Sequence, residues 1–211
     1  MNKLSPLLLL LAFLAACAPT GPAGRPVLYQ DNFDDTGSGW FADTFDAGEH
    51  SYQNGSYRIF ISSVDWFSWV VNPSAAVYGD IRVEADAQKL SGPDANEYGV
   101  VCRVDYEASS LYAGVVTSDG QYAVYKSINE GPLELVGMAA MGFSQAVKTG
   151  ETTNHIRFDC IGNTLTLFAN DTQLVQVTDD TLASGEVGLY SGTFDPGGTE
   201  IFFDNFVVYQ P

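Results

Sequence analysis

The sequence predicts an all-β domain in which antiparallel strands form a sandwich or a barrel. Short runs that are apolar, or that alternate between apolar and polar residues, recur along the 211-residue chain. Turn-forming residues separate these runs, and pairs such as Asp119-Gly120 and Gly162-Asn163 are typical of tight hairpins. No convincing amphipathic helix interrupts the series. Many short strands with regular turns are typical of sandwiches and barrels.

The N-terminus has the pattern of an exported lipoprotein. Lys3 provides a positive charge, and the apolar run at 7–14 is too short to span a bilayer as a permanent helix. The sequence Leu14-Ala15-Ala16-Cys17 follows it and resembles the lipobox of bacterial lipoproteins, in which the cysteine is acylated and becomes the mature N-terminus. We therefore predict a signal peptide at 1–16 and lipid attachment at Cys17. An ordinary secretory signal with a chance cysteine is the alternative.

These assignments divide the rest of the chain. Residues 17–26 combine the lipidated cysteine with a flexible tether rich in Ala, Pro and Gly, and residues 27–211 suit one large β domain better than two small ones. We expect the protein to be exported and to be held by its lipid anchor only, facing the periplasm or the cell exterior. The chain has 26 acidic and 9 basic residues and a net charge of -17, so nucleic acid is a poor partner.

The predicted strands follow one another through the domain. The early ones are the runs at 56–62, 67–71, 80–88 and 98–104. A hairpin follows at 111–127, and three strands then meander from His155 to Val177. The runs at 185–191 and 200–210 complete the series.

Two cysteines remain once Cys17 is assigned to the lipid. Cys102 and Cys160 both lie in strand-like runs, and alternation places each of them on an apolar face. Disulfides persist in exported proteins, so we predict a Cys102–Cys160 bridge, worth about 4 kcal/mol on the chain-entropy model. Two buried free thiols are the alternative. A metal site is not expected at these cysteines, because the spacing typical of zinc ligands is missing.

A series of motifs extends over nearly the whole domain. The pieces are YQDNFDDTGSGW (29–40), GSYRI (55–59), GDIRVEADAQ (79–88), YGVVCRVD (98–105), SDGQYAVYK (118–126), NTLTLFANDTQLVQVTD (163–179), GEVGLYSG (185–192) and FDNFVVYQ (203–210). Their order resembles the concanavalin A-like lectin/glucanase superfamily, and within it the laminin-G-like and 3-keto-disaccharide hydrolase-type domains of bacterial secreted proteins. The resemblance implies a jelly-roll sandwich of two antiparallel sheets with a concave face that often holds sugar. Such a fold does not by itself define a function.

The acidic motif of the glucanases in this superfamily is incomplete here. Those enzymes carry Glu-x-Asp-x-x-Glu on one strand, and a retaining glycosidase needs two carboxylates about 5 to 5.5 Å apart. Glu84 and Asp86 share one strand face, but Gln88 cannot replace an acid and the downstream Glu is missing. We therefore assign no catalytic residue and expect two solvated carboxylates. A sugar-acting hydrolase is the alternative, and it would need two carboxylates, or one with His155 or His50, in a single cleft.

The resemblance also implies a structural calcium ion near the paired chain ends. The positions that match the family pattern are Asp31, Asp34 and Asp204. Hard oxygen ligands of this kind suit calcium at extracellular concentrations. The alternative is that the N-terminal aspartates form turns while Asp204 lies on a solvent-exposed face.

Aromatic residues make up 13% of the chain and suggest a sugar-binding face. In the segment 66–69, alternation places Phe67 and Trp69 on one face and Trp66 with Ser68 on the other. Sugars stack on exposed rings through their apolar C–H faces. Core or cross-strand packing of these rings is the alternative.

A second observation concerns Arg103. Alternation points its side chain away from the Cys102 face, towards an outer sheet surface that could hold ligand. The predicted ligand-binding residues are Arg103, Trp66, Tyr112, Tyr122 and Tyr125. Because the chain is strongly acidic, we expect a neutral glycan as the partner. The sequence thus favours a surface lipoprotein with a non-catalytic carbohydrate-binding or adhesion domain, and a structural or protein-interaction envelope module without a sugar ligand is the alternative.

Overall fold

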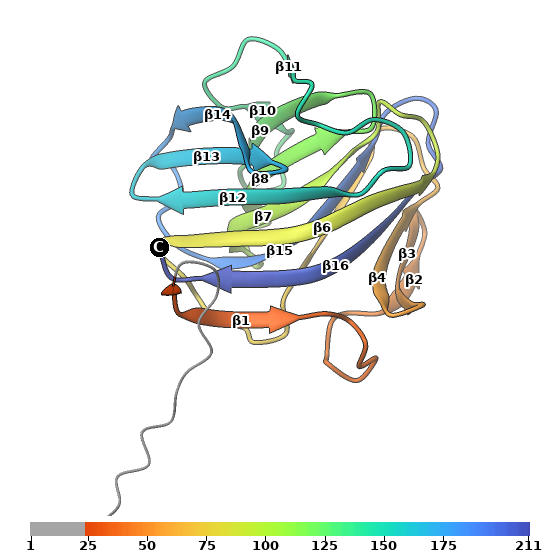
Figure 1. The fold of residues 1–211 in the computed structure, drawn as a ribbon, viewed down its shortest axis with the longest axis horizontal. Coiled ribbons are helices and arrows are strands. Elements are labelled where there is room, and N and C mark those ends of the chain that lie inside the picture. Colours follow the sequence, from red (N-terminus) through yellow and green to blue (C-terminus); the bar gives the residue numbers. More distant parts are fainter. Residues whose placement is uncertain (1–23) are drawn as a thin grey trace, which may run out of the picture.

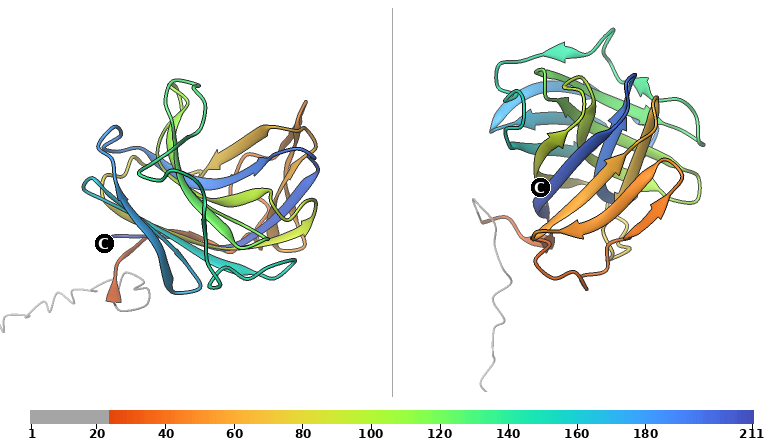
Figure 2. Two further views of the ribbon diagram at one scale, coloured as in Figure 1. Left: turned by 90° about the horizontal axis from the view of Figure 1, so that it is seen from above. Right: turned by 90° about the vertical axis from the view of Figure 1, so that its right-hand side faces the viewer.

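Two antiparallel β-sheets pack face to face in the computed structural model, which describes residues 24–211 (Figure 1). The two sheets form separate layers when the molecule is seen from above (Figure 2, left). This arrangement confirms the predicted all-β sandwich. The predicted signal peptide, the predicted lipid attachment site at Cys17 and most of the predicted tether lie outside the described residues. Within residues 24–211, no helix has the length and apolar character needed to cross a membrane.

The nine-stranded sheet has the order β14-β13-β12-β6-β16-β4-β3-β2, with β1 paired to β16. Its strands are β1 (Val27–Asp31), β2 (Asp43–Phe45), β3 (Gly48–Gln53), β4 (Ser56–Ile61), β6 (Ile81–Ser91), β12 (Asn154–Ile161), β13 (Thr164–Ala169), β14 (Thr172–Thr178) and β16 (Thr199–Tyr209). The meander predicted from His155 onwards is present as β12, β13 and β14. Asn170 and Asp171 both have positive φ in the turn between β13 and β14, as a tight hairpin requires.

The seven-stranded sheet has the order β10-β9-β8-β7-β15-β5, with β11 paired to β9. Its strands are β5 (Trp66–Val71), β7 (Glu97–Asp105), β8 (Ser110–Thr117), β9 (Gln121–Ser127), β10 (Glu134–Leu135), β11 (Gly142–Phe143) and β15 (Glu186–Thr193). Strand β5 ends this order, so one of its edges has no neighbouring strand within the sheet. This free edge of β5 borders a cavity lined by residues of both sheets.

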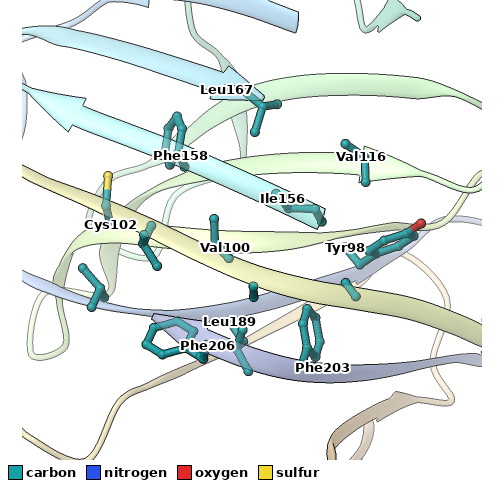
Figure 3. Packing of buried hydrophobic residues seen from close by; sticks show 14 of the residues in the cluster. Tyr98, Val100, Cys102, Val116, Ile156, Phe158, Leu167, Leu189, Phe203 and Phe206 are labelled. Atoms are coloured by element: carbon teal, nitrogen blue, oxygen red, sulfur yellow. The ribbon is translucent and has the colours of Figure 1, made fainter. Parts of the chain in front are cut away.

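The main core fills the space between the two sheets (Figure 3). Alternation supplies it from both sides: Tyr98, Val100 and Cys102 point inwards from β7, and Ile156 and Phe158 point inwards from β12. Apolar area removed from water stabilises such a core by roughly 25 cal/mol per Å². The core is therefore built from the faces that the period-two pattern predicts.

The disulfide between Cys102 and Cys160 is present and joins the two layers. Its Cα atoms are 6.8 Å apart, and both cysteines are fully buried in the core. Cys102 belongs to β7 of one sheet and Cys160 to β12 of the other. The predicted bridge is thus confirmed, and it closes a loop with a sequence separation of 58 residues.

A second, smaller apolar cluster covers the outer face of the seven-stranded sheet. Its buried members include Val101, Ala113 and Val115, together with the aromatic residues Tyr125 and Tyr190. Partly buried side chains complete this outer cluster, namely Phe67, Trp69, Val71, Leu133, Leu135 and Met141. This outer face of the seven-stranded sheet therefore carries several large aromatic side chains.

Candidate functional site

A cavity of about 400 Å³ opens at the free edge of β5, where the β2–β3 hairpin of the other sheet lies beside it. The walls are mostly aromatic. The lining residues are Phe41, Phe45, His50, Trp66, Phe67, Ser68, Trp69, Val70, Val71, Tyr106 and Ser109. Several of the rings are open to solvent: Phe41 is 56% exposed, Trp66 48% and Tyr106 65%. Exposed rings of this size are costly in water, so their clustering marks a binding surface.

A second cavity of about 210 Å³ shares the rings of Trp66 and Phe67 with the first. Its lining residues are Asp65, Trp66, Phe67, Glu97, Leu133, Tyr190, Thr193 and Phe194. We call the two cavities together the aromatic groove. It therefore extends from His50 at the sheet edge to Glu97 on the outer face of the seven-stranded sheet.

The side chains of β5 alternate between the outer face of the seven-stranded sheet and the main core. Phe67 and Trp69 pack on the outer cluster, whereas Val70 points into the main core. This confirms the predicted division of the segment into two faces. Trp66 starts the strand, and as an edge residue it stays half exposed between the cavities.

His50 lies in the first cavity as a neutral imidazole. Its Nε2 is 2.9 Å from the Ser68 Oγ, and the rings of Phe41 and Phe45 pack against it edge-on. Burial lowers the pKa of His50 to about 4, because the imidazolium would lose its hydration there. Its buried Nδ1 has no hydrogen-bond partner in the protein. The cavity thus contains a polar nitrogen that a ligand could satisfy.

Glu97 lies in the second cavity and is almost fully buried. The Tyr190 hydroxyl donates to its Oε1 at 2.6 Å, and Oε2 has no partner. Burial raises the pKa of Glu97 to about 7, against the lowering effect of hydrogen bonds from Tyr190 and Tyr125. Gly192 pairs with Glu97 across β15 and β7, and a Cβ at Gly192 would stand 2.7 Å from Oε1. A glycine at this position is what leaves room for the carboxyl group.

Arg103 does not lie on the outer surface, so the predicted exposure of its side chain was wrong. Its φ is 53°, and the pairing of β7 with β8 shifts register between Cys102 and Asp105. This β-bulge interrupts the alternation on which the prediction depended. The guanidinium is buried and donates to the carbonyl oxygens of Leu182 at 2.8 Å and Gly162 at 2.6 Å.

The aromatic residues predicted to bind ligand lie in different parts of the structure. Trp66 lines the groove, and Tyr125 lies in the outer cluster, where it supports Glu97. Tyr112 is buried in the main core opposite Cys102, with its hydroxyl donating to Asp179, and Tyr122 packs against the same core. The structure therefore brings one predicted ring into the groove, one beneath it and two elsewhere.

Glu84, Asp86 and His155 meet on the outer face of the nine-stranded sheet, away from the aromatic groove. The His155 Nδ1 is 2.8 Å from an Asp86 oxygen, and its Nε2 is 3.5 Å from a Glu84 oxygen. Hydrogen bonds to Asp86 and Glu84 raise the pKa of His155 to about 9. The carboxylates are thus paired rather than freely solvated, which differs from the expectation. A histidine held protonated in this way cannot act as a general base near neutral pH.

The three aspartates expected to hold calcium are engaged locally. Asp31 accepts hydrogen bonds from the Phe33 amide and the Trp40 indole, and Asp204 accepts one from the Asn205 amide. In the part of the chain that the structure describes, no group of three His, Cys, Asp or Glu side chains is arranged to hold a metal ion. The arrangement matches the alternative of aspartate turns. Calcium stays a prediction of the resemblance, without support from these side chains.

Comparison with known proteins gives a fold and no family. No protein-family model matches the chain, and no curated protein matches it. Among solved structures, a Bacillus subtilis protein of unknown function with a galectin-like fold matches with a TM-score of 0.64 and 12% identity, over 87% of this chain and 96% of that one.

Two further solved structures have printed functions. The carbohydrate-binding module CBM66 from Bacillus subtilis matches with a TM-score of 0.58 and 16% identity, over 82% of this chain and 96% of that one. The catalytic domain of an endo-1,3-β-glucanase (laminarinase) from Thermotoga petrophila matches with a TM-score of 0.55 and 8% identity, over 88% and 98%. At these identities the likeness shows the shared sandwich fold alone.

Proposed function

We propose that this domain binds carbohydrate without cleaving it, through the aromatic groove, and that it does so as part of a lipid-anchored surface protein. The observation that carries the proposal is the combination of exposed rings with buried polar atoms that lack partners. Trp66 and Phe41 offer flat apolar surfaces, while the His50 Nδ1 and the Glu97 Oε2 lie unpaired beside them. A sugar has apolar C–H faces and hydroxyl donors, so it complements both features.

The two unpaired polar atoms support a ligand with hydroxyl groups, which can both donate and accept hydrogen bonds. A buried polar atom without a partner costs about 1–3 kcal/mol, and a bound hydroxyl group would remove that cost. A carbohydrate-binding module has the same fold, which supports the proposed function at the level of the fold. A net charge of -17 disfavours polyanionic glycans.

A binding role is favoured over hydrolysis by the placement of the acidic groups. The strand-borne pair of Glu84 and Asp86 lies on the other sheet, where His155 is bound between the two side chains. The groove therefore does not contain the strand-borne pair that the resemblance to glucanases points to, and its own carboxyl groups are those of Asp65 and Glu97. We place Glu97 in the groove as a ligand-contacting group and not as one member of a catalytic pair.

The test is glycan-array binding of the purified protein, followed by calorimetry with the best glycan. Trp66→Ala removes a half-exposed ring, and we expect it to weaken binding about ten-fold, or about 1.4 kcal/mol. Phe143→Ala is the matched control, because Phe143 is also exposed but lies on β11, at the far side of the seven-stranded sheet from β5 (Figure 2, right). Equal losses in the two variants, or no glycan bound by the unmodified protein, would favour the protein-interaction alternative.

A further inference from the structure

The Glu97 end of the aromatic groove has an unusual charge arrangement. The Tyr190 hydroxyl donates to one oxygen of the Glu97 carboxyl group, and the second oxygen of that group stays unpaired although it is buried. In the described residues, none of the ion pairs involves Glu97, so no protein cation balances it. A buried carboxylate without a counter-charge is costly and usually either takes up a proton or gains a cation.

The walls of this cavity suit a cation. The rings of Trp66, Phe67, Tyr190 and Phe194 line it, and Phe67 stacks on Tyr190 with centroids 6.0 Å apart. Aromatic faces attract ammonium groups, by about 2 kcal/mol or more when the contact is shielded from water. The exposed carboxylate of Asp65 stands at the same cavity and adds a second negative charge. A neutral hydroxyl group would gain less than an ammonium group from the aromatic faces and from the negative charges of Glu97 and Asp65.

We propose that the Glu97 end of the aromatic groove binds the ammonium group of an amino sugar. The proposal rests on the proposed carbohydrate-binding function and changes its ligand class from neutral to cationic sugar. The ammonium donates to the free Glu97 Oε2 while the four rings surround its CH neighbours. The raised pKa of Glu97 agrees with this, because the free protein lacks the positive charge that the ligand would supply.

The test uses calorimetry at pH 6 with the purified protein and three β-1,4-linked tetramers, of glucosamine, of N-acetylglucosamine and of glucose. We expect the glucosamine tetramer to bind at least ten-fold more tightly than the N-acetylated one. Its binding should release protons, seen as a dependence of the heat on the buffer, because the ammonium displaces the proton of Glu97. Glu97→Gln should remove both the preference and the proton release. The glutamine still accepts a hydrogen bond from Tyr190, and a melting curve confirms that the variant folds.

The outcomes separate this proposal from the proposed function. Equal binding of all three tetramers, or a preference that survives in Glu97→Gln, would overturn the ammonium site and leave the carbohydrate-binding function standing. Binding of none of the three would count against both. A trilysine peptide that binds as tightly as the glucosamine tetramer would overturn the assignment to a sugar.

Discussion

His50 and Glu97 are placed in the same groove by different elements, yet both keep one polar atom without a partner. Their burial moves the two pKa values in opposite directions, to about 4 for His50 and to about 7 for Glu97. The neutral form is therefore favoured in both residues. Such unpaired groups are uncommon in folded proteins and concentrate where a ligand completes them.

The raised pKa of Glu97 predicts a pH-dependent stability of the free protein. The folded carboxyl titrates near pH 7 and the unfolded one near 4.5, so its contribution is fully present below pH 4.5 and is lost as the pH rises through 7. Glu97→Gln should match the unmodified protein at pH 4 and exceed it by about 2–3 kcal/mol in unfolding free energy at pH 8. Urea titrations at both pH values measure this.

The control for that prediction is Asp65→Asn, which removes an exposed carboxylate from the same cavity. The pH dependence of unfolding should change less in Asp65→Asn than in Glu97→Gln, because the Glu97 side chain is buried and that of Asp65 is exposed. A constant difference between Glu97→Gln and the unmodified protein at all pH values would show that Glu97 does not titrate as its burial implies.

At the scale of the strand, the bulge in β7 turns Arg103 from a surface residue into a structural one. Its guanidinium holds the carbonyl oxygens of Leu182 and Gly162, which belong to two different connections of the chain. We expect Arg103→Ala to lower the unfolding free energy by about 2–4 kcal/mol, because charge-assisted hydrogen bonds are lost and two carbonyls are left without a donor. Thermal melts of Arg103→Ala and of Arg103→Lys measure the loss.

Glycan binding should not change with the same substitution. Below its melting temperature, Arg103→Ala should bind the same glycan as the unmodified protein, since the side chain lies away from the groove lining. A stable variant that has lost binding would return Arg103 to the ligand site.

Strand alternation predicted the fold well and the site only in part. It placed Cys102 and Cys160 each on an apolar face and divided β5 correctly, because these strands are regular over the residues concerned. It failed at Arg103, where one residue in the left-handed region reverses the pattern. Glu97 could not be found in this way, since the partner that identifies it, Tyr190, stands 93 residues later on β15.

At the scale of the whole molecule, the first strand of the domain lies at a defined place relative to the groove. The strand β1 begins where the tether ends, and it pairs with the last strand β16, so that Gln210 donates to the carbonyl of Pro26. Figure 1 shows the start of β1 at one end of the long axis, and β2 and β3, which flank the groove, towards the other. The strands that flank the groove therefore lie towards the opposite end of the molecule from the start of β1.

The anchor itself is tested by Cys17→Ser. Replacement of the acylated cysteine should abolish labelling by a fatty-acid probe and release the protein from the membrane fraction, because the chain has no other predicted means of attachment. Metabolic labelling and fractionation measure this, with Cys102→Ser as a cysteine control that keeps the lipobox. Equal labelling of Cys17→Ser and the unmodified protein would contradict the lipoprotein assignment.

The pairing of β1 with β16 also determines how the domain would respond to mechanical load. A glycan held in the groove and an anchor beyond residue 26 would pull on opposite ends of the molecule, along the direction of β1 (Figure 1). The hydrogen bonds between the antiparallel β1 and β16 would then be sheared together instead of being opened one after another. A strand pair loaded in this geometry resists force through all its hydrogen bonds at once.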